Sequence, residues 1–470
     1  MKNSTVVILI VAVVAIVAIG AFALLSGGDD DKDYSDKPGI VTPVTDDPSR
    51  ETAAADGRLW IVGNANMDDV LDEKDVEWIQ KIIDGKANEI MFNAGLSKKY
   101  SVDVRMADAN QDGVVDYKDI EKVRELIAMK IDSPKQLVYY VDVDGAINTA
   151  HVPFKTTIST YEQNSKQLQT IHALDTVIGC DFQSVRDHIY AQKTLNESLI
   201  IFNSYSERKD PDVQLIMKYA PDAVLTGTRD IYCNTLEKAL PADRTTMDVV
   251  RISSFEDNKV IEGTLTLGFM MCKNAEAQDY ANWSDKWLNL ISERTSKLSA
   301  DQKVKVLCPR GEYNDWNITM NGPRSGKYET SLLAGADNII TRNLTSSSTN
   351  ITVTDEWVKA QSDLDYIVCI VYGDLNNAVK YDFTNKSFYD TAVDYWKPMT
   401  NAYGTQVHVL DNLVGQGTTY VIGAVYMAKW FYPELFEDMD PDAIFQEFMD
   451  RFLQYDFDVK AYQANGGIAI

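Results

Sequence analysis

The chain has 470 residues, with 45 Lys and Arg against 70 Asp and Glu, and a net charge of −25. Its 45% hydrophobic and 24% charged content excludes a wholly disordered chain. A pI near 4.5 excludes nucleic acid as a partner bound through a basic face, because phosphate neutralisation requires clustered Lys and Arg. We therefore expect an acidic, folded protein of about three units at ~150 residues each.

The first predicted element is an apolar helix within residues 1–27. An uncharged run extends from Val6 to Leu25 and follows Lys2. About 20 residues at ~1.5 Å rise per residue span a hydrocarbon core of ~30 Å. Because basic residues stay on the cytoplasmic side, we expect a membrane anchor that places the rest of the chain outside the cytoplasm, at the cell surface. A cleaved secretory signal is the alternative, because the Ala-Phe-Ala at 21–23 resembles a cleavage site.

Residues 28–57 are rich in Asp, Pro and small residues and poor in large apolar ones. Such a segment cannot bury enough surface to fold by itself. We predict a disordered acidic tether.

Residues 58–132 contain an internal repeat of a loop followed by an amphipathic helix. In the second copy, DANQDGVVDYKD, oxygen-bearing side chains fall at loop positions 1, 3, 5, 9 and 12, and a glycine falls at position 6. A hard cation takes about six to eight oxygen ligands, and this spacing supplies them from one short loop. The predicted Ca²⁺ ligands are Asp108, Asn110, Asp112, the Val114 carbonyl, Asp116 and Asp119 in the second loop, and Asn64, Asn66, Asp68, Asp72 and Asp75 in the first.

The first copy, NANMDDVLDEKD, departs from this pattern. Asn64 replaces the first Asp, and Asp69 stands at the glycine position, so we expect weaker affinity there. The alternative for each loop is a solvated acidic helix start without an ion. The paired loops, with Asp at position 12 and an extended segment before the first loop, resemble a dockerin, which implies one or two Ca²⁺ ions and a cohesin-like protein partner. A calcium-stiffened spacer remains the alternative.

From Lys135 onward, short apolar strands alternate with amphipathic helices, which indicates α/β units. The strand candidates are VYYVDVDG, DTVIGCD, DAVLTG, KVKVLCPRG and DYIVCIVYG. No glycine or proline occurs between Gly268 and Pro309, so we predict one long helix over 269–300 between an N-terminal lobe, 135–268, and a C-terminal lobe, 301–470. Asp440-Pro441 predicts the start of a closing helix with an apolar aromatic face.

Five segments in order resemble the substrate-binding proteins of ABC transporters for iron-siderophores and cobalamin. They are YVDVDGAINTAHVPFKTTISTY, DPDVQLIMKYAPDAVLTG, SLLAGADNII, YWKPMTNAYGTQVHVL and MAKWFYPELF. The resemblance implies two α/β lobes joined by one long interlobe helix, with a ligand held between the lobes. The expected fold class is therefore α/β, with a small α-helical dockerin-like domain and an N-terminal transmembrane helix.

Ligands of open α/β sheets collect at the carboxyl ends of strands, and the predicted ligand-binding residues are taken from those positions. Arginines bind carboxylates or phosphates, and aromatic rings stack on planar ligands, so we expect an anionic, partly planar metal chelate. Surface ion pairs are the alternative for each arginine alone. The predicted residues are Tyr161, Arg229, Arg310, Tyr313, Trp316, Arg324 and Tyr372.

The resemblance also implies two acidic contacts with an ABC permease in the membrane. Glu356 occupies the matching position in the C-terminal lobe, whereas the N-terminal lobe has Gln214 there, with Asp212 two residues earlier as the substitute. We find no nucleophile elbow, HExxH or P-loop and expect no enzyme activity. The expected function is capture of an iron-siderophore, cobalamin or haem-type chelate for import; the alternative is a surface scaffold attached through the dockerin-like domain.

Overall fold

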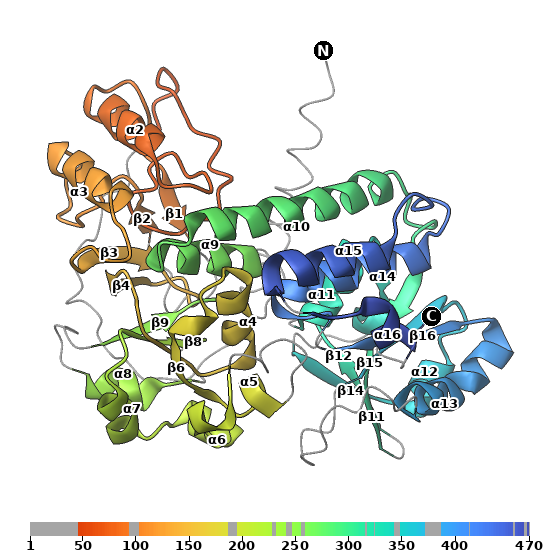
Figure 1. Ribbon diagram of the computed structural model, residues 1–470. Coiled ribbons are helices and arrows are strands. Elements are labelled where there is room, and N and C mark those ends of the chain that lie inside the picture. Colours follow the sequence, from red (N-terminus) through yellow and green to blue (C-terminus); the bar gives the residue numbers. More distant parts are fainter. Residues whose placement is uncertain are drawn as a thin grey trace, which may run out of the picture.

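The computed structural model describes residues 46–93, 103–186, 195–227, 232–240, 247–254, 259–314, 317–323, 325–342, 348–371, 387–412, 414–454, 456–464 and 468–469 (Figure 1). The predicted membrane anchor lies outside these residues, as do Arg229, Trp316, Arg324 and Tyr372. Within the described part of the chain, no helix is both long enough and apolar enough to cross a membrane.

The predicted repeats form two matching loop–helix units. Helix α2 (Glu73–Ile83) and helix α3 (Tyr117–Ile127) each begin with a capping box, in which the N-cap Asp accepts a hydrogen bond from the helix backbone and the Asp at the third helical position accepts one from the N-cap backbone N–H. The N-cap residues Asp72 and Asp116 have nearly the same backbone angles, φ −143° for both. The spacer between the units adds a short antiparallel pair that the sequence did not indicate, β1 (Met91–Asn93) and β2 (Asp103–Arg105).

The last residues of the predicted disordered tether are fixed, which corrects that prediction for residues 46–57. Backbone hydrogen bonds join Glu51 to Lys86 and Asn88, and Gly57 donates to the Met67 carbonyl at 2.7 Å. The segment has few apolar side chains, so its order comes from backbone groups paired with residues distant in sequence.

The next layer is an antiparallel hairpin followed by a five-stranded parallel sheet. The hairpin pairs β3 (Gln136–Val141) with β4 (Ile147–Val152). The sheet has the order β7-β6-β5-β8-β9. Its strands are β5 (Thr157–Ser159), β6 (Val177–Asp181), β7 (Ile200–Phe202), β8 (Ala223–Thr226) and β9 (Asp248–Arg251). The intervening helices are α4 (Glu162–Thr170), η1 (Leu174–Thr176), α5 (Gln183–Arg186), η2 (Glu197–Leu199), α6 (Tyr205–Lys209), α7 (Val213–Tyr219) and α8 (Asn234–Ala239).

The glycine- and proline-free stretch contains a helix that is shorter than predicted. Helix α9 (Val260–Met270) extends into this stretch by two residues, Cys272 adopts a left-handed φ of 53°, and α10 (Asn274–Thr295) follows with 22 residues. Figure 1 shows α10 running from α9 along one side of the molecule to α11 and α14 in the C-terminal half.

The C-terminal half is built on a mixed eight-stranded sheet with the central order β13-β10-β15-β11-β12-β14, in which β16 pairs with β15 and β17. Its strands are β10 (Lys305–Leu307), β11 (Pro309–Asn314), β12 (Asn317–Asn321), β13 (Asp337–Asn338), β14 (Asn350–Thr354), β15 (Tyr366–Val371), β16 (Gln406–Asp411) and β17 (Ile468–Ala469). Its helices are α11 (Gly326–Leu333), η4 (Ile339–Thr341), α12 (Asp355–Lys359), α13 (Ser387–Tyr403), η5 (Gly417–Thr419), α14 (Tyr420–Phe431), α15 (Pro441–Phe448), η6 (Met449–Leu453) and α16 (Val459–Ala464).

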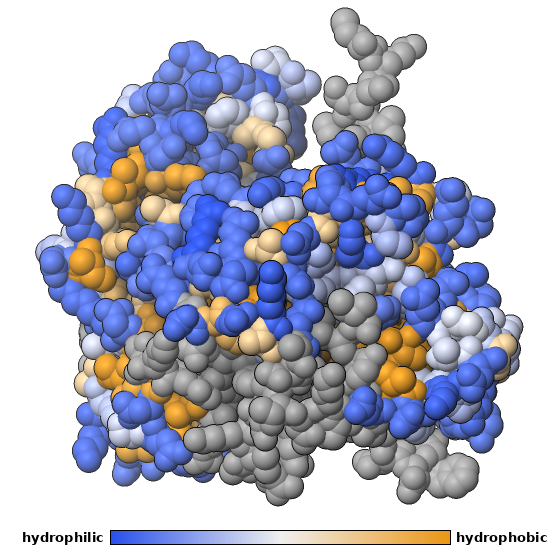
Figure 2. All heavy atoms as spheres, turned by 45° about the vertical axis from the view of Figure 1, so that its right-hand side comes forward, coloured by the Kyte–Doolittle hydropathy of each residue, from blue (hydrophilic) through white to orange (hydrophobic). Residues whose placement is uncertain are grey.

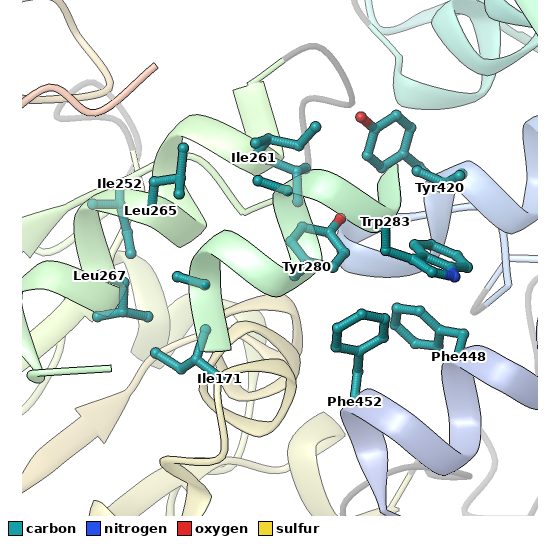
Figure 3. Close-up of a cluster of buried hydrophobic side chains, with 14 of the residues drawn as sticks. Ile171, Ile252, Ile261, Leu265, Leu267, Tyr280, Trp283, Tyr420, Phe448 and Phe452 are labelled. Atoms are coloured by element: carbon teal, nitrogen blue, oxygen red, sulfur yellow. The ribbon is translucent and has the colours of Figure 1, made fainter. Parts of the chain in front are cut away.

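The predicted closing helix is confirmed as α15 with η6. Asp440 caps it and Pro441 is its first residue. Its aromatic face packs on α10: the ring centroids of Trp283 and Phe448 lie 5.2 Å apart, and those of Tyr280 and Phe452 lie 5.8 Å apart (Figure 3). This buried cluster holds α10 against the C-terminal half.

Candidate functional site

The parallel sheet changes direction at β5. From β5 the chain adds β6 and β7 on one side and then β8 and β9 on the other. Ligands of open α/β sheets bind at the carboxyl ends of the strands beside such a switch point. Tyr161 lies at this place, two residues after the end of β5 and at the N-cap of α4. The structure therefore puts one predicted ligand-binding residue at the position where the topology favours a ligand.

Around Tyr161 lies a buried polar group that we call the α4 entrance cluster: Tyr161, Glu162, Asp181, Gln183 and Arg208. The Arg208 guanidinium is 1% exposed. Its Nη1 lies 3.5 Å from Glu162 Oε2 and 3.7 Å from Asp181 Oδ2, and its Nη2 donates to Gln183 Oε1. One buried cation is thus shared by two carboxylates.

Aromatic rings enclose the same guanidinium. Its carbon lies 4.3 Å from the ring centroid of Tyr205, 5.1 Å from that of Tyr161 and 5.6 Å from that of Phe182. A cation over an aromatic face is attracted by the ring quadrupole, more strongly where water is excluded. The cluster is consequently a preorganised site in which the arginine is fixed from several sides.

Burial changes the protonation behaviour of this cluster. It raises the pKa of Asp181 to about 6, although Arg208 and a hydrogen bond from the Ser184 hydroxyl act in the opposite direction. Burial, together with the neighbouring Glu162, raises the pKa of Tyr161 well above its ordinary value. The Tyr161 phenol is therefore protonated at neutral pH and serves as a hydrogen-bonding group.

The C-terminal half meets this cluster through Gln416, just before η5. Its side-chain amide donates to the Tyr161 hydroxyl at 3.2 Å and accepts from Lys327 Nζ at 2.8 Å. Its backbone carbonyl accepts from Lys166 Nζ at 3.1 Å. Both lysines are nearly fully buried. Gln416 thus joins groups from the two halves at their junction.

The whole of α4 is buried although eight of its nine residues are polar. Its Asn164 amide is 1% exposed and has no hydrogen-bond partner on either side-chain atom, and Gln163 Oε1 also has none. Buried amides in proteins are generally satisfied by ordered water or by a bound molecule. The junction can therefore hold a polar small molecule by hydrogen bonds.

Of the other predicted ligand-binding residues, the structure describes only two. Arg310 is half-buried in β11 and donates to Asn350 Oδ1 at 3.0 Å, and Tyr313 lies in the same strand. Arg229, Trp316, Arg324 and Tyr372 lie outside the described residues. The buried cations that the structure does bring to the junction, Arg208, Lys166 and Lys327, were not among the predicted residues. The sequence does carry a signal for Lys166. The helix that contains it is polar on every side, whereas a surface helix usually has one apolar stripe.

The predicted permease contacts are exposed. Asp212 caps α7 by accepting a hydrogen bond from the Leu215 backbone at 3.0 Å, and Glu356 lies in the first turn of α12. A backbone hydrogen bond and the Thr354 side chain lower the pKa of Glu356, so it is ionised at neutral pH. Figure 1 places α7 and α12 in different halves, both away from α10.

In each predicted calcium loop, backbone N–H groups donate hydrogen bonds to the carboxylate at the last loop position. Both oxygens of Asp75 accept backbone hydrogen bonds, from Asn66 and Asp72, and Asp119 repeats this arrangement with Asn110 and Asp116. Among the residues that the structure describes, no three His, Cys, Asp or Glu side chains are drawn together as ligands of a metal ion.

Position 1 of each loop nevertheless shows a feature that fits a cation. Asn64 is fully buried and Asp108 is 2% exposed, and the Oδ1 atom of each has no hydrogen-bond partner. A buried oxygen without a partner is costly, and the same atom is left so in both copies. Burial also raises the pKa of Asp75 to about 7 and that of Asp119 to about 6, although the backbone hydrogen bonds that both carboxylates accept act in the opposite direction.

The chain is similar to known proteins in its structure and not in its sequence. No family model and no curated protein sequence matches the chain. The TroA-like periplasmic binding protein FepB from Veillonella parvula superposes with a TM-score of 0.53 at 16% identity, covering 68% of this chain and 97% of that chain. The part of the chain that superposes therefore has the fold of the TroA-like periplasmic binding proteins.

Two further structures agree. An ABC transporter solute binding protein from Sulfurospirillum deleyianum has a TM-score of 0.53 at 17% identity, covering 70% of this chain and 98% of its own. Ceue from Helicobacter pylori, determined with Ni(II) bound, has a TM-score of 0.50 at 17% identity, covering 69% of this chain and 98% of its own. FepB and the Sulfurospirillum protein are binding proteins by name.

Proposed function

We propose that the chain is the substrate-binding component of an ABC importer and captures a metal chelate between its two halves at the outer face of the membrane. The observation that carries this proposal is the convergence of the α4 entrance cluster with Gln416 and Lys327 at the carboxyl ends of the strands, in a fold shared with binding proteins. Helix α10 takes the role of the interlobe helix. An iron-siderophore, cobalamin or haem-type ligand fits a junction that combines cations, amides and aromatic rings.

The test is quenching of intrinsic fluorescence by ferric siderophores, cobalamin and haem, each added to the purified chain. We expect one of them to bind with a Kd below roughly 10 μM, about −7 kcal/mol. Tyr161→Phe keeps the ring and removes the hydroxyl that meets Gln416, and it should weaken binding. Tyr403→Phe is the matched control and should not weaken it, because the Tyr403 hydroxyl on α13 donates to the Lys359 carbonyl on α12. Absence of binding by all three ligands would contradict the import proposal.

A permease in the membrane is the partner that this function requires. We propose Asp212 and Glu356 as its two contacts, because both are exposed carboxylates at helix starts in different halves. Residues 1–27 supply the membrane anchor or signal in this proposal, and residues 28–57 the tether, whose end is fixed as described above.

We further propose that the two loops bind Ca²⁺. The buried, unpartnered oxygens of Asn64 and Asp108 support this, together with the matched geometry of the two copies. When bound, calcium would neutralise the buried carboxylates, and the loop residues named above would hold it. Calcium at 100 times its Kd should stabilise the chain by about 2.7 kcal/mol per site. Asp112→Ala should remove the contribution of the second loop, whereas Glu125→Gln, an exposed acid on α3, should not.

A second function is favoured by one surface feature. Val114 and Tyr117, at positions 7 and 10 of the second loop, are 57% and 61% exposed. Exposed apolar side chains beside a dockerin-like loop suit attachment to a cohesin-like protein, which would make the chain part of a surface assembly. Tyr117→Ser should abolish binding to such a partner and leave chelate binding unchanged. If the chain binds a chelate but no protein partner, the assembly function is wrong and only import stands.

A further inference from the structure

The loop–helix pair is built into the same body as the two α/β halves. The segment before the first loop lies alongside β3: Val62 N–H donates to the Tyr139 carbonyl at 2.9 Å, and Val141 N–H donates to the Trp60 carbonyl at 3.0 Å. Ile61 lies opposite Tyr140 as an antiparallel bridge and is fully buried. This segment therefore continues the β3–β4 hairpin as an additional short strand.

One hydrophobic core extends through both parts. Leu59, Val76, Ile79, Ile120 and Val123 from the loop–helix pair belong to the same buried cluster as the apolar residues of β3, α9 and α10. Figure 1 shows α2 and α3 seated above β3, β4 and the start of α10. A domain that shares its core with its neighbour cannot move freely on a linker.

A charged bridge connects the first loop to α10. Arg58 donates to both carboxylate oxygens of Asp285 at 2.7 Å, and its backbone N–H donates to Asp69 Oδ1 at 2.6 Å while its guanidinium bonds the same carboxylate. The Arg58 side chain is 24% exposed. Burial by itself would lower its pKa, but the hydrogen bonds to Asp285 and Asp69 raise the pKa of Arg58 above its ordinary value. Bidentate pairing of this kind fixes both distance and orientation.

Asp69 is the residue that departs from the repeat at position 6. The second loop has Gly113 there, with φ +91°, and its carbonyl accepts a hydrogen bond from Arg105 at 2.8 Å. Arg105 in turn pairs with Glu89, which lies within the loop–helix pair. Among the described contacts, the position-6 residue of the first loop is thus connected to α10, and that of the second loop is connected inside its own unit.

We propose that Asp69, Arg58 and Asp285 couple the first calcium loop to α10, so that ion binding and the packing of α10 stabilise one another. This rests on the proposed calcium function. An ion bound between Asn64 and Asp75 restricts the backbone that carries Asp69, which holds Arg58 and through it Asp285. Linkage is reciprocal: if docking strengthens ion binding, ion binding strengthens docking by the same factor. Asp69 then serves to dock the first loop on α10, which explains why an aspartate stands where the second loop has a glycine.

Hydrogen exchange of the full-length chain, with Ca²⁺ and with chelator, tests the coupling. We expect Ca²⁺ to slow exchange in the two loops and also in α10 and β3. Arg58→Met and, separately, Asp285→Asn should abolish the slowing in α10 and weaken Ca²⁺ binding to the first loop by about five-fold or more. Asp285→Asn leaves the loop itself untouched, so it separates coupling from damage to the loop. Arg294→Met is the matched control, because Arg294 also lies in α10 and pairs with Asp438 away from the loops.

Calorimetry on the same samples distinguishes the two kinds of failure. If Ca²⁺ produces no binding heat, the proposed calcium function is wrong and the coupling is excluded with it. If Ca²⁺ binds but slows exchange only within residues 64–75 and 108–119, or if both variants keep the slowing in α10, calcium binding stands and the coupling is wrong.

Discussion

At the scale of single residues, Arg208 organises the junction. Two carboxylates and three aromatic rings surround its guanidinium, and the side chain is almost entirely withdrawn from water. A buried ion pair adds little stability compared with a hydrophobic pair of the same shape, but removing one partner leaves an uncompensated charge. The cluster therefore fixes the geometry around Tyr161 and depends on each of its members.

Arg208→Met should lower the free energy of unfolding by about 3–5 kcal/mol, because Glu162 and Asp181 would remain buried without their cation. Urea unfolding at pH 7 measures this loss. Arg294→Met removes a pair whose Asp438 side chain is 69% exposed, and it should cost only about 0–1 kcal/mol. Equal losses for the two variants would show that Arg208 is not energetically special.

The raised pKa of Asp181 predicts a pH dependence. The folded state holds the Asp181 proton with a pKa of about 6, above the ordinary 3.8, so the proton stabilises the fold in acid and this contribution is lost as the pH rises through about 6. Between pH 4 and pH 7 the wild-type chain should lose about 2 kcal/mol relative to Asp181→Asn, which has no proton to lose. Comparing the two chains removes the contribution of other acids. A difference that is constant with pH would contradict the assignment.

At the scale of elements, α4 and η5 form the contact between the halves. Thr170 Oγ1 donates to Thr418 Oγ1 at 2.9 Å, and the Tyr280 hydroxyl of α10 donates to the Thr418 carbonyl at 3.0 Å. Gly417 lies at the closest approach: a Cβ there would stand 2.0 Å from Gln163 Oε1. Its φ of +62° is a second reason for glycine at this position.

Gly417→Ala should therefore both strain the backbone and push α4 away from η5. Gly404 has a φ of +76° with no atom within 4 Å of its absent Cβ, so Gly404→Ala introduces only the backbone strain. We expect Gly404→Ala to cost about 1 kcal/mol and Gly417→Ala about 1–3 kcal/mol more. Thermal unfolding of both variants measures the difference, and equal shifts would mean that Gln163 adapts without loss.

At the scale of the whole molecule, the loop–helix pair, the hairpin and the two α/β halves share one continuous core. The surface in Figure 2 is mainly hydrophilic over the described residues, with small apolar patches, as expected for an acidic protein exposed to water. The high acidity is thus distributed between the loops and a solvated surface, while the junction of the halves carries buried cations.

Deletion of residues 46–132 should destabilise the remainder of the chain, because it removes the strand at Trp60–Val62 and uncovers Val138 and Tyr140 of β3. Losing the packing of Leu59, Ile61 and Val62 alone should cost about 5 kcal/mol or more, at ~1.5–3 kcal/mol per buried side chain. A chain that begins at residue 46 is the control. Unchanged unfolding of the shortened chain would show that the pair is an independent domain.

The sequence alone determined what depends on short-range chemistry. The helix after each of the two loops, the closing helix after Asp440 and five strands are present as predicted, because caps and apolar periodicity act over a few residues. The strands are those around Val138, Cys180, Val224, Val306 and Val368. The position of Tyr161 could be predicted because a residue that follows a parallel strand lies at a known edge of the sheet, whereas its ligand-binding role stays a prediction.

Only the tertiary structure decided which charges meet. Arg208, Lys166 and Lys327 are distant in sequence and reach one junction through the order of the strands and the packing of α4 on η5. The same holds for Asp69: its departure from the repeat indicated a weakened loop, whereas the fold brings Arg58 and Asp285 to it. No local pattern encodes such contacts, because they depend on the path of the whole chain.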